Sequence, residues 1–195
     1  MKKTVTKILF YGLIFVIGVG YGTTAGSVLP PDYHADDDFE HIVMYEQFWQ
    51  LIQDSQAHCL ALNIYHESRS DNLAGQFAVA DVVLNRVEHP RYPNTICEVV
   101  YQAKMKPSWK NPEILVPIRN KCQFSWYCDG KSDLPSELDA WTQSQYVAYS
   151  ILKDGHFRGL TEGATHYHTT YVSPTWNKHL YSIGRIGSHV FFRSE

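Results

Sequence analysis

The acidic residue with the most informative surroundings is Glu67, in the segment Ile64-Tyr-His-Glu-Ser-Arg69 at the end of a predicted apolar helix. Desolvation raises the pKa of a carboxyl group that lies among aromatic side chains beside a cleft. A glutamate in such a place stays protonated near neutral pH and can donate a proton to a glycosidic oxygen. The alternative is a surface ion pair in which Glu67 is only the partner of Arg69.

A second carboxylate acts as nucleophile or base in most glycosidases. Asp81 falls within an apolar helix, and we expect it on the polar face of that helix. Sequence neighbours single out none of the candidates, and a mechanism with one acid would need none of them. The candidates are Asp71, Asp81, Glu98, Asp129 and Glu162.

Histidines are frequent in the C-terminal third of the chain. His166 and His168 flank Tyr167, so a strand would place both imidazoles on one face, where they could bind zinc. No His-Glu-x-x-His motif and no acidic third ligand at a recognisable spacing accompanies them. The sequence therefore favours polar cleft residues or structural hydrogen bonds, and we expect no metal and no cofactor. The histidines are His156, His166, His168, His179 and His189.

The segment Cys122-Gln-Phe-Ser-Trp-Tyr-Cys128 holds aromatic and amide side chains between two cysteines. A disulfide would clamp these side chains into a rigid loop that suits sugar contacts, although an ordinary packed loop is an equal alternative. The other cysteines are Cys59 and Cys97. An even number of cysteines in an exported domain predicts two disulfides, with three pairings open.

These residues are positioned by elements that hydrophobic spacing predicts to be mostly helical. Asp54 or Ser55 can cap the second helix and Thr95 a short one. The three prolines of 102–121 predict a long loop, and the tail 161–193 predicts loops and short strands. The fold class is therefore mainly α, an α+β domain with small strand content. The predicted helices cover 39–53, 56–67, 73–87, 95–101 and a stretch from after Pro135 to Lys153.

The N-terminus has the layout of an export signal. Residues 1–7 hold three lysines and no acid, and an apolar run follows from Ile8 to Tyr21. The segment could be cleaved or could stay as an anchor in the inner membrane over residues 8–25. We therefore expect a signal or anchor over 1–25, an acidic linker over 26–40 and an exported domain over 41–195, periplasmic or extracellular.

The composition of the chain limits the classes of function that it can have. The chain has 195 residues, 44 % hydrophobic, which is enough for one domain with a core. Seventeen Lys and Arg against twenty Asp and Glu give a net charge of −3, which argues against nucleic-acid binding. No Gly-x-Ser-x-Gly elbow and no nucleotide-binding glycine loop occurs in the sequence.

Several blocks of the sequence resemble the SleB/CwlJ cell wall hydrolases, which include spore-cortex-lytic enzymes. The resemblance implies a compact, mainly helical domain related to lysozyme-like lytic transglycosylases. It also implies cleavage of the bond between N-acetylmuramic acid and N-acetylglucosamine in peptidoglycan glycan strands. The matching blocks are Cys59-Leu-Ala-Leu-Asn-Ile-Tyr-His-Glu-Ser-Arg69, Gly75-Gln76, Ala78-Val-Ala-Asp-Val-Val-Leu-Asn-Arg86, Tyr92-Pro-Asn-Thr-Ile-Cys97, Val99-Val-Tyr-Gln102, Cys122-Gln-Phe-Ser125 and Ile186-Gly-Ser-His-Val-Phe191.

The family's catalytic glutamate lies in a Tyr-x-Glu-x-Arg motif, which maps onto Glu67. It would protonate the leaving oxygen and then, as a base, help the muramic 6-hydroxyl close a 1,6-anhydro ring. We also expect a monomer that touches a membrane only through its N-terminal segment. The substrate-binding residues expected from it are Tyr65, Arg69, Gln123, Phe124, Ser125, His166, Tyr167 and Trp176.

Two other functions remain open from the sequence. One is a zinc-dependent peptidoglycan amidase or endopeptidase that uses His166 and His168. The other is a non-catalytic wall-binding module in which Glu67 only pairs with Arg69. Whether a glycosidase of this kind leaves anhydro or hydrolysed ends is also open, because both reactions begin with the same protonation.

Overall fold

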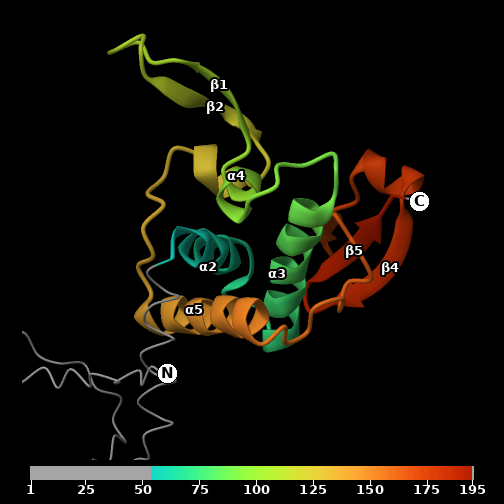
Figure 1. The fold of residues 1–195 in the computed structure, drawn as a ribbon. Coiled ribbons are helices and arrows are strands. Elements are labelled where there is room, and N and C mark those ends of the chain that lie inside the picture. Colours follow the sequence, from blue (N-terminus) through green and yellow to red (C-terminus); the bar gives the residue numbers. More distant parts are fainter. Residues whose placement is uncertain (1–53, 195) are drawn as a thin grey trace, which may run out of the picture. The chain divides into compact units, whose positions relative to one another are not determined.

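The computed structural model describes residues 54–194, and the predicted helix over 39–53 and the predicted signal or anchor lie outside them. The described chain contains four α-helices (Figure 1). No helix among these residues is long and apolar enough to cross a membrane. The helices are α2 (Ser55–Ser68), α3 (Leu73–Glu88), α4 (Ile96–Val100) and α5 (Leu138–Lys153).

Side-chain caps fix where three of these helices begin. Asp54 accepts a hydrogen bond from the backbone N–H of Gln56, and Thr95 accepts one from that of Glu98. Asn72 caps α3 in the same way. Each cap satisfies a backbone donor that a helix start leaves free. The predicted helices that fall within the described residues are confirmed, with ends shifted by at most a few positions.

The core lies among the helices, with α2 packed against α3, α4 and α5. Leu60 and Ile64 of α2 are fully buried, as are Val83 of α3 and Val147 of α5. A disulfide between Cys59 and Cys97 ties α2 to α4. The end of α2, which carries Glu67, is thus fixed by packing on several sides.

The stretch 102–121 is a β-hairpin, so its prediction as a loop is wrong. Strands β1 (Ala103–Pro107) and β2 (Leu115–Cys122) pair antiparallel. Pro107 is the last residue of β1. Pro117 lies in a sheet of only two strands, so each strand has an outer edge where no backbone N–H is needed for pairing. Proline is tolerated at such positions and so does not break the pairing.

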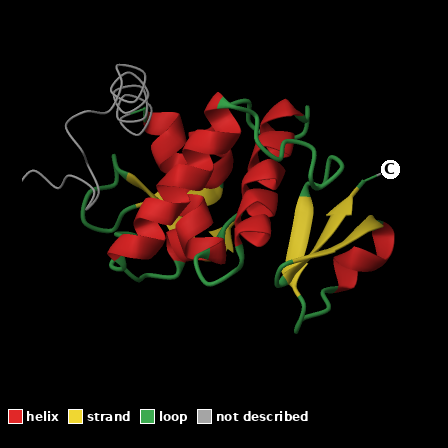
Figure 2. Cartoon of the chain, turned by 90° about the horizontal axis from the view of Figure 1, so that it is seen from below, coloured by secondary structure: helices red, strands yellow, loops and turns green. Residues whose placement is uncertain are grey.

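The tail forms a second, three-stranded antiparallel sheet in the order β3-β5-β4 (Figure 2), which confirms the predicted short strands. Phe191 of β5 is fully buried against Ala78 and Val82 of α3. The α+β fold class is therefore confirmed. The strands are β3 (His166–Thr169), β4 (Tyr181–Ile186) and β5 (His189–Arg193), and short 3₁₀ turns cover Ser125–Cys128 and Thr175–His179.

Asp81 links α3 to the loop before β3. The expectation that it lies on a polar, solvated face is wrong, because its side chain is completely buried. Its carboxylate pairs with Arg158 and accepts hydrogen bonds from the backbone N–H and the hydroxyl of Thr161. The buried charge is thus fully compensated, as a buried carboxylate requires.

Candidate active site

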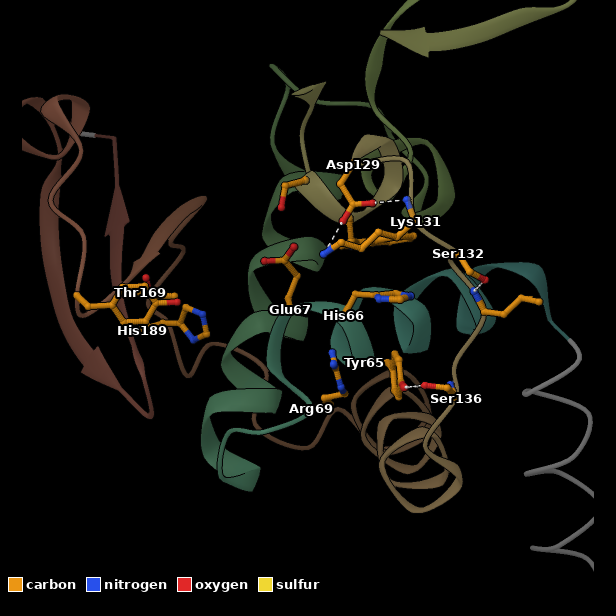
Figure 3. A pocket seen from close by; sticks show the side chains of 14 residues that line it. Tyr65, His66, Glu67, Arg69, Asp129, Lys131, Ser132, Ser136, Thr169 and His189 are labelled. Atoms are coloured by element: carbon orange, nitrogen blue, oxygen red, sulfur yellow. Dashed lines mark hydrogen bonds and ion pairs between the residues drawn. The ribbon is translucent and has the colours of Figure 1, made fainter. Parts of the chain in front are cut away.

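Glu67 lies in the last turn of α2, where the helix meets two adjoining cavities. Figure 3 shows the larger of the two. The cavities have volumes of about 440 and 310 Å³, and both are lined by Glu67 and by Ser125. A polymer that occupied both would pass directly over the Glu67 carboxyl group. The geometry is that of a groove with an acid at its centre.

The surroundings of Glu67 favour its protonated form. Burial is the largest influence and raises the pKa of Glu67 above the ordinary value for a glutamate. The hydroxyl of Tyr167 donates a hydrogen bond to Oε2 at 3.1 Å, and the charge of Arg86 acts in the same direction, so both moderate the rise in pKa. The net effect is a carboxyl group that keeps its proton to higher pH than an exposed one.

Tyr167 and Arg86 approach Glu67 from the sheet and from α3. Burial and the nearby Glu67 raise the pKa of Tyr167 far above its ordinary value, so its hydroxyl remains a donor. Arg86 is buried, and its Nε donates to the carbonyl of Thr165 at 2.8 Å. Its guanidinium lies 5.1 Å from the ring of Phe124, and within residues 54–194 its Nη1 has no hydrogen-bond partner.

Arg86 was not among the residues expected in the site. The signal that could have identified it is its position on the predicted helix 73–87, whose apolar pattern places an arginine where a hydrophobic residue would be usual. A buried arginine needs a compensating group. The carbonyl of Thr165 and the ring of Phe124 are such groups for Arg86.

A second network, also missed from the sequence, lies beside Tyr167. Asp71 accepts hydrogen bonds from the backbone and hydroxyl of Ser188 at 2.9 and 2.7 Å and faces His189 Nδ1 at 3.3 Å. Burial alone would raise the pKa of Asp71, but these hydrogen bonds together lower it. Burial lowers the pKa of His189, whose ring packs edge-on against Tyr167 at 5.1 Å.

Two glycines make room for this carboxylate. A Cβ atom at Gly75 or at Gly187 would overlap the side chain of Asp71, and Gly187 also has a positive φ of 58°. Both positions therefore require glycine. The sequence shows the glycines and the acid but gives no sign that they meet, because residues 71 and 188 come together only in the folded chain.

Tyr65 and Arg69 contact the loop that covers one cavity. The Tyr65 hydroxyl accepts hydrogen bonds from the backbone N–H groups of Ser136 and Glu137 at 3.0 and 3.2 Å. Arg69 pairs with Glu137 at 3.0 Å and not with Glu67. Both side chains line the larger cavity while they hold this loop against α2 (Figure 3).

The smaller cavity brings together residues from the segment 122–128 and from the tail. The Cys122–Cys128 disulfide closes this segment at its ends, and with Cys59–Cys97 it confirms the expectation of two disulfides. All the residues predicted for the site therefore border one cavity or the other, although their roles stay predictions. The smaller cavity is lined by Glu67, Arg86, Cys122, Gln123, Phe124, Ser125, His166, Tyr167 and Trp176.

His166 and His168 lie on β3, with Trp176 at 5.5 and 5.6 Å from their rings. His168 is engaged at both nitrogens, by the carbonyl of Thr169 and by the side chain of Asn177. Among residues 54–194 no three His, Cys, Asp or Glu side chains are placed to share a metal ion. These observations give the two histidines no further ligand with which to hold zinc.

Of the candidate second carboxylates, Asp129 lines the larger cavity together with Glu67 (Figure 3). It lies 3.8 Å from the ammonium group of Lys131. The other four line neither cavity. Asp71 holds Ser188, Asp81 is buried against Arg158, Glu98 accepts a hydrogen bond from the Thr95 hydroxyl, and Glu162 is exposed in a turn.

The α+β domain thus carries a largely buried carboxyl group with a raised pKa in a polar groove. Residues 70–192 match the family model described as cell wall hydrolase. The chain therefore belongs to the cell wall hydrolase family, as the resemblance of the sequence blocks predicted, and is an enzyme that acts on the cell wall. The matched residues begin just after Glu67.

The fold is similar to that of the catalytic domain of the germination-specific lytic transglycosylase SleB from Bacillus anthracis. The two share 24 % sequence identity with a TM-score of 0.52, over 71 % of this chain and 93 % of that one. The catalytic domain of the Bacillus cereus SleB protein also matches, with 24 % identity, a TM-score of 0.49, and coverage of 71 % and 89 %. The search of curated proteins gave no significant match.

Proposed function

We propose that this cell wall hydrolase is a lytic transglycosylase that cleaves the bond between N-acetylmuramic acid and N-acetylglucosamine, with Glu67 as its acid and base. The observation that carries the proposal is the placement of Glu67 where two cavities meet, with a pKa raised by burial. A general acid works best when its pKa lies near the operating pH.

In the first half of the reaction, the Glu67 carboxyl group donates its proton to the glycosidic oxygen. The bond from that oxygen to C1 of the muramic sugar breaks, and the N-acetylglucosamine end leaves as an alcohol. The Glu67 carboxylate that results is stabilised by the Tyr167 hydroxyl and by the charge of Arg86. It can then act as a base.

In the second half, the muramic 6-hydroxyl attacks C1 and its proton passes to the Glu67 carboxylate. The 1,6-anhydro ring forms, and Glu67 is again protonated, so no other reactant is consumed. A single carboxyl group therefore suffices. This agrees with the positions of four of the other candidate acids, none of which lines either cavity.

The sugar-binding residues are proposed from their places along the groove. Aromatic rings stack on sugar faces, and amide and hydroxyl groups bind sugar hydroxyls, so both cavities have suitable linings. Trp176 would supply the stacking, and Gln123, Ser125 and His166 the hydrogen bonds. The ring of Phe124 is buried beside the Arg86 guanidinium, so Phe124 would act by supporting the groove lining. Tyr65 and Arg69 would act by holding the loop over the larger cavity.

Asp129 supports a second candidate, a hydrolase of the muramidase type. It lines the same cavity as Glu67 and could activate a water molecule as a base. The two reactions differ in their products. Transglycosylation leaves anhydro-muramic ends, whereas hydrolysis leaves reducing muramic ends.

For the cellular setting, we propose export through residues 1–25, with residues 8–25 either removed or kept as an inner-membrane anchor. The supports are the basic and then apolar sequence of this segment and the two disulfides of the domain, which suit an oxidising compartment. The enzyme would act there as a monomer on glycan strands.

Mass spectrometry of the soluble products tests the proposed reaction. The purified protein is incubated with peptidoglycan beside its Asp129→Asn variant. We expect anhydro-muramic ends from both proteins. If the wild type instead leaves reducing muramic ends and Asp129→Asn does not, the enzyme is a muramidase and not a transglycosylase. Release of stem peptides, abolished by a chelator, would instead favour the zinc amidase.

A further inference from the structure

The β1–β2 hairpin has an apolar surface that the proposed reaction does not use. It extends away from the helices (Figure 1). Met105 is paired with Pro117 and Pro107 with Leu115, so these four side chains share one face, while Lys106 is on the other. Leu115 is 58 % exposed, and Trp109 at the tip is 87 % exposed.

The tip that carries Trp109 is ordered by its own hydrogen bonds. The N–H of Ser108 donates to the carbonyl of Ile114 at 2.8 Å, and the N–H of Ile114 donates to that of Asn111 at 3.0 Å. The ammonium group of Lys110 lies 5.3 Å from the Trp109 ring. A turn with its own backbone hydrogen bonds therefore keeps the apolar side chains at the tip exposed to solvent.

The hairpin is also cationic. Residues 103–122 contain five Lys and Arg and one Glu, whereas the rest of the described chain contains nine basic and twelve acidic residues. Such a segment is complementary to an anionic surface. The cations are Lys104, Lys106, Lys110, Arg119 and Lys121.

We propose that the β1–β2 hairpin docks on an anionic lipid bilayer, with Trp109, Ile114, Leu115 and Met105 in the interfacial layer and the lysines against lipid phosphates. Tryptophan at the boundary, aliphatic side chains below it and lysines beside it are the composition that suits this layer. A hydrated anionic wall polymer would be matched by the lysines alone and would leave the apolar face in water.

Docking would also orient the groove. The N–H of Gln123 donates to the carbonyl of Gln102 at 2.8 Å, so the base of the hairpin is joined directly to the segment that lines the smaller cavity. A hairpin held at the bilayer would keep the groove at a fixed distance from the membrane, where glycan strands close to the membrane would reach it.

The test uses Trp109 as its own reporter in the full-length protein. Emission spectra are recorded for the wild type and for Trp109→Phe with vesicles of phosphatidylglycerol and of phosphatidylcholine, with and without brominated acyl chains. The difference between the two proteins isolates Trp109, so lipid contacts of the N-terminal segment cancel. We expect this difference spectrum to shift to the blue and to be quenched by brominated phosphatidylglycerol.

Charge variants provide the matched control. Lys110→Gln removes the charge beside Trp109 at the tip and should raise about fivefold the phosphatidylglycerol concentration that gives half-maximal quenching at low salt. Lys178→Gln, an exposed lysine elsewhere, should leave this concentration unchanged. Circular dichroism shows that each variant is folded. Absence of quenching in both lipids would overturn the proposal. Two results with Trp109→Ser would also overturn it, if binding to vesicles is unchanged. One is weaker sedimentation with isolated wall, and the other is a change from dimer to monomer.

Discussion

Replacing Tyr167 by phenylalanine tests how the site sets the acidity of Glu67. The substitution removes the hydroxyl that donates to Glu67 Oε2 at 3.1 Å and keeps the ring that packs on Phe191 and His189. The lost hydrogen bond stabilises the carboxylate form, so its removal raises the pKa of Glu67 further. Because the protonated form starts the reaction, the variant should keep its activity to higher pH.

The size of the effect follows from the energy of a hydrogen bond to a charged group, about 1.5–3 kcal/mol. Glu67 keeps some exposure where it lines the two cavities, so the lower part of this range applies. One pH unit corresponds to about 1.4 kcal/mol. The alkaline limb of the profile of kcat/KM against pH should therefore move upward by about one unit.

The assay follows the clearing of a peptidoglycan suspension over a series of pH values, at fixed ionic strength. Tyr181→Phe, which removes a hydroxyl from a half-exposed tyrosine of β4, is the matched control and should leave the limb in place. An alkaline limb that does not move in Tyr167→Phe, with the fold intact, would refute the assignment of that limb to Glu67. A downward shift would refute the direction of the argument.

Two further predictions concern stability. Replacing Cys59 and Cys97 by serine removes a disulfide between residues 38 positions apart, which should lower the free energy of unfolding by about 4 kcal/mol. Calorimetry should then show a melting temperature about 10 °C lower, and an unchanged melting temperature would contradict this. Asp81→Ala leaves Arg158 without its buried partner and should cost about 3 kcal/mol in urea unfolding. Glu88→Ala removes the exposed partner of the same arginine and should cost less than about 1 kcal/mol, and equal losses would refute the distinction.

The helices could be predicted from the sequence because their apolar spacing and their capping residues are local. Asp54 and Thr95 mark helix starts within a few residues of the hydrophobic pattern that follows. The hairpin could not be predicted in the same way. Pro107 and Pro117 argue against strands when only one chain segment is considered. They are tolerated because each strand of a two-stranded sheet has a free outer edge, which the sequence of one segment does not show.

The acid at the centre of the site could be proposed from the sequence because Glu67 lies in a recognisable motif. The groups that tune it could not, because Tyr167 and Arg86 reach Glu67 only when the tail folds onto α3. The network of Asp71 with Ser188 and His189 joins residues more than a hundred positions apart. Contacts between residues so far apart in the chain produce no residue pattern that can be recognised in a single sequence.

Turnover of peptidoglycan by Glu67→Gln tests the central claim most directly, since glutamine keeps the shape of the side chain and cannot supply the proton. Anhydro-muramic products are quantified by mass spectrometry, and thermal unfolding and sedimentation with isolated wall serve as controls. We predict a folded protein that still binds the wall and whose turnover is lost by at least two orders of magnitude. A folded variant with turnover close to that of the wild type would contradict the assignment of Glu67 as the catalytic acid.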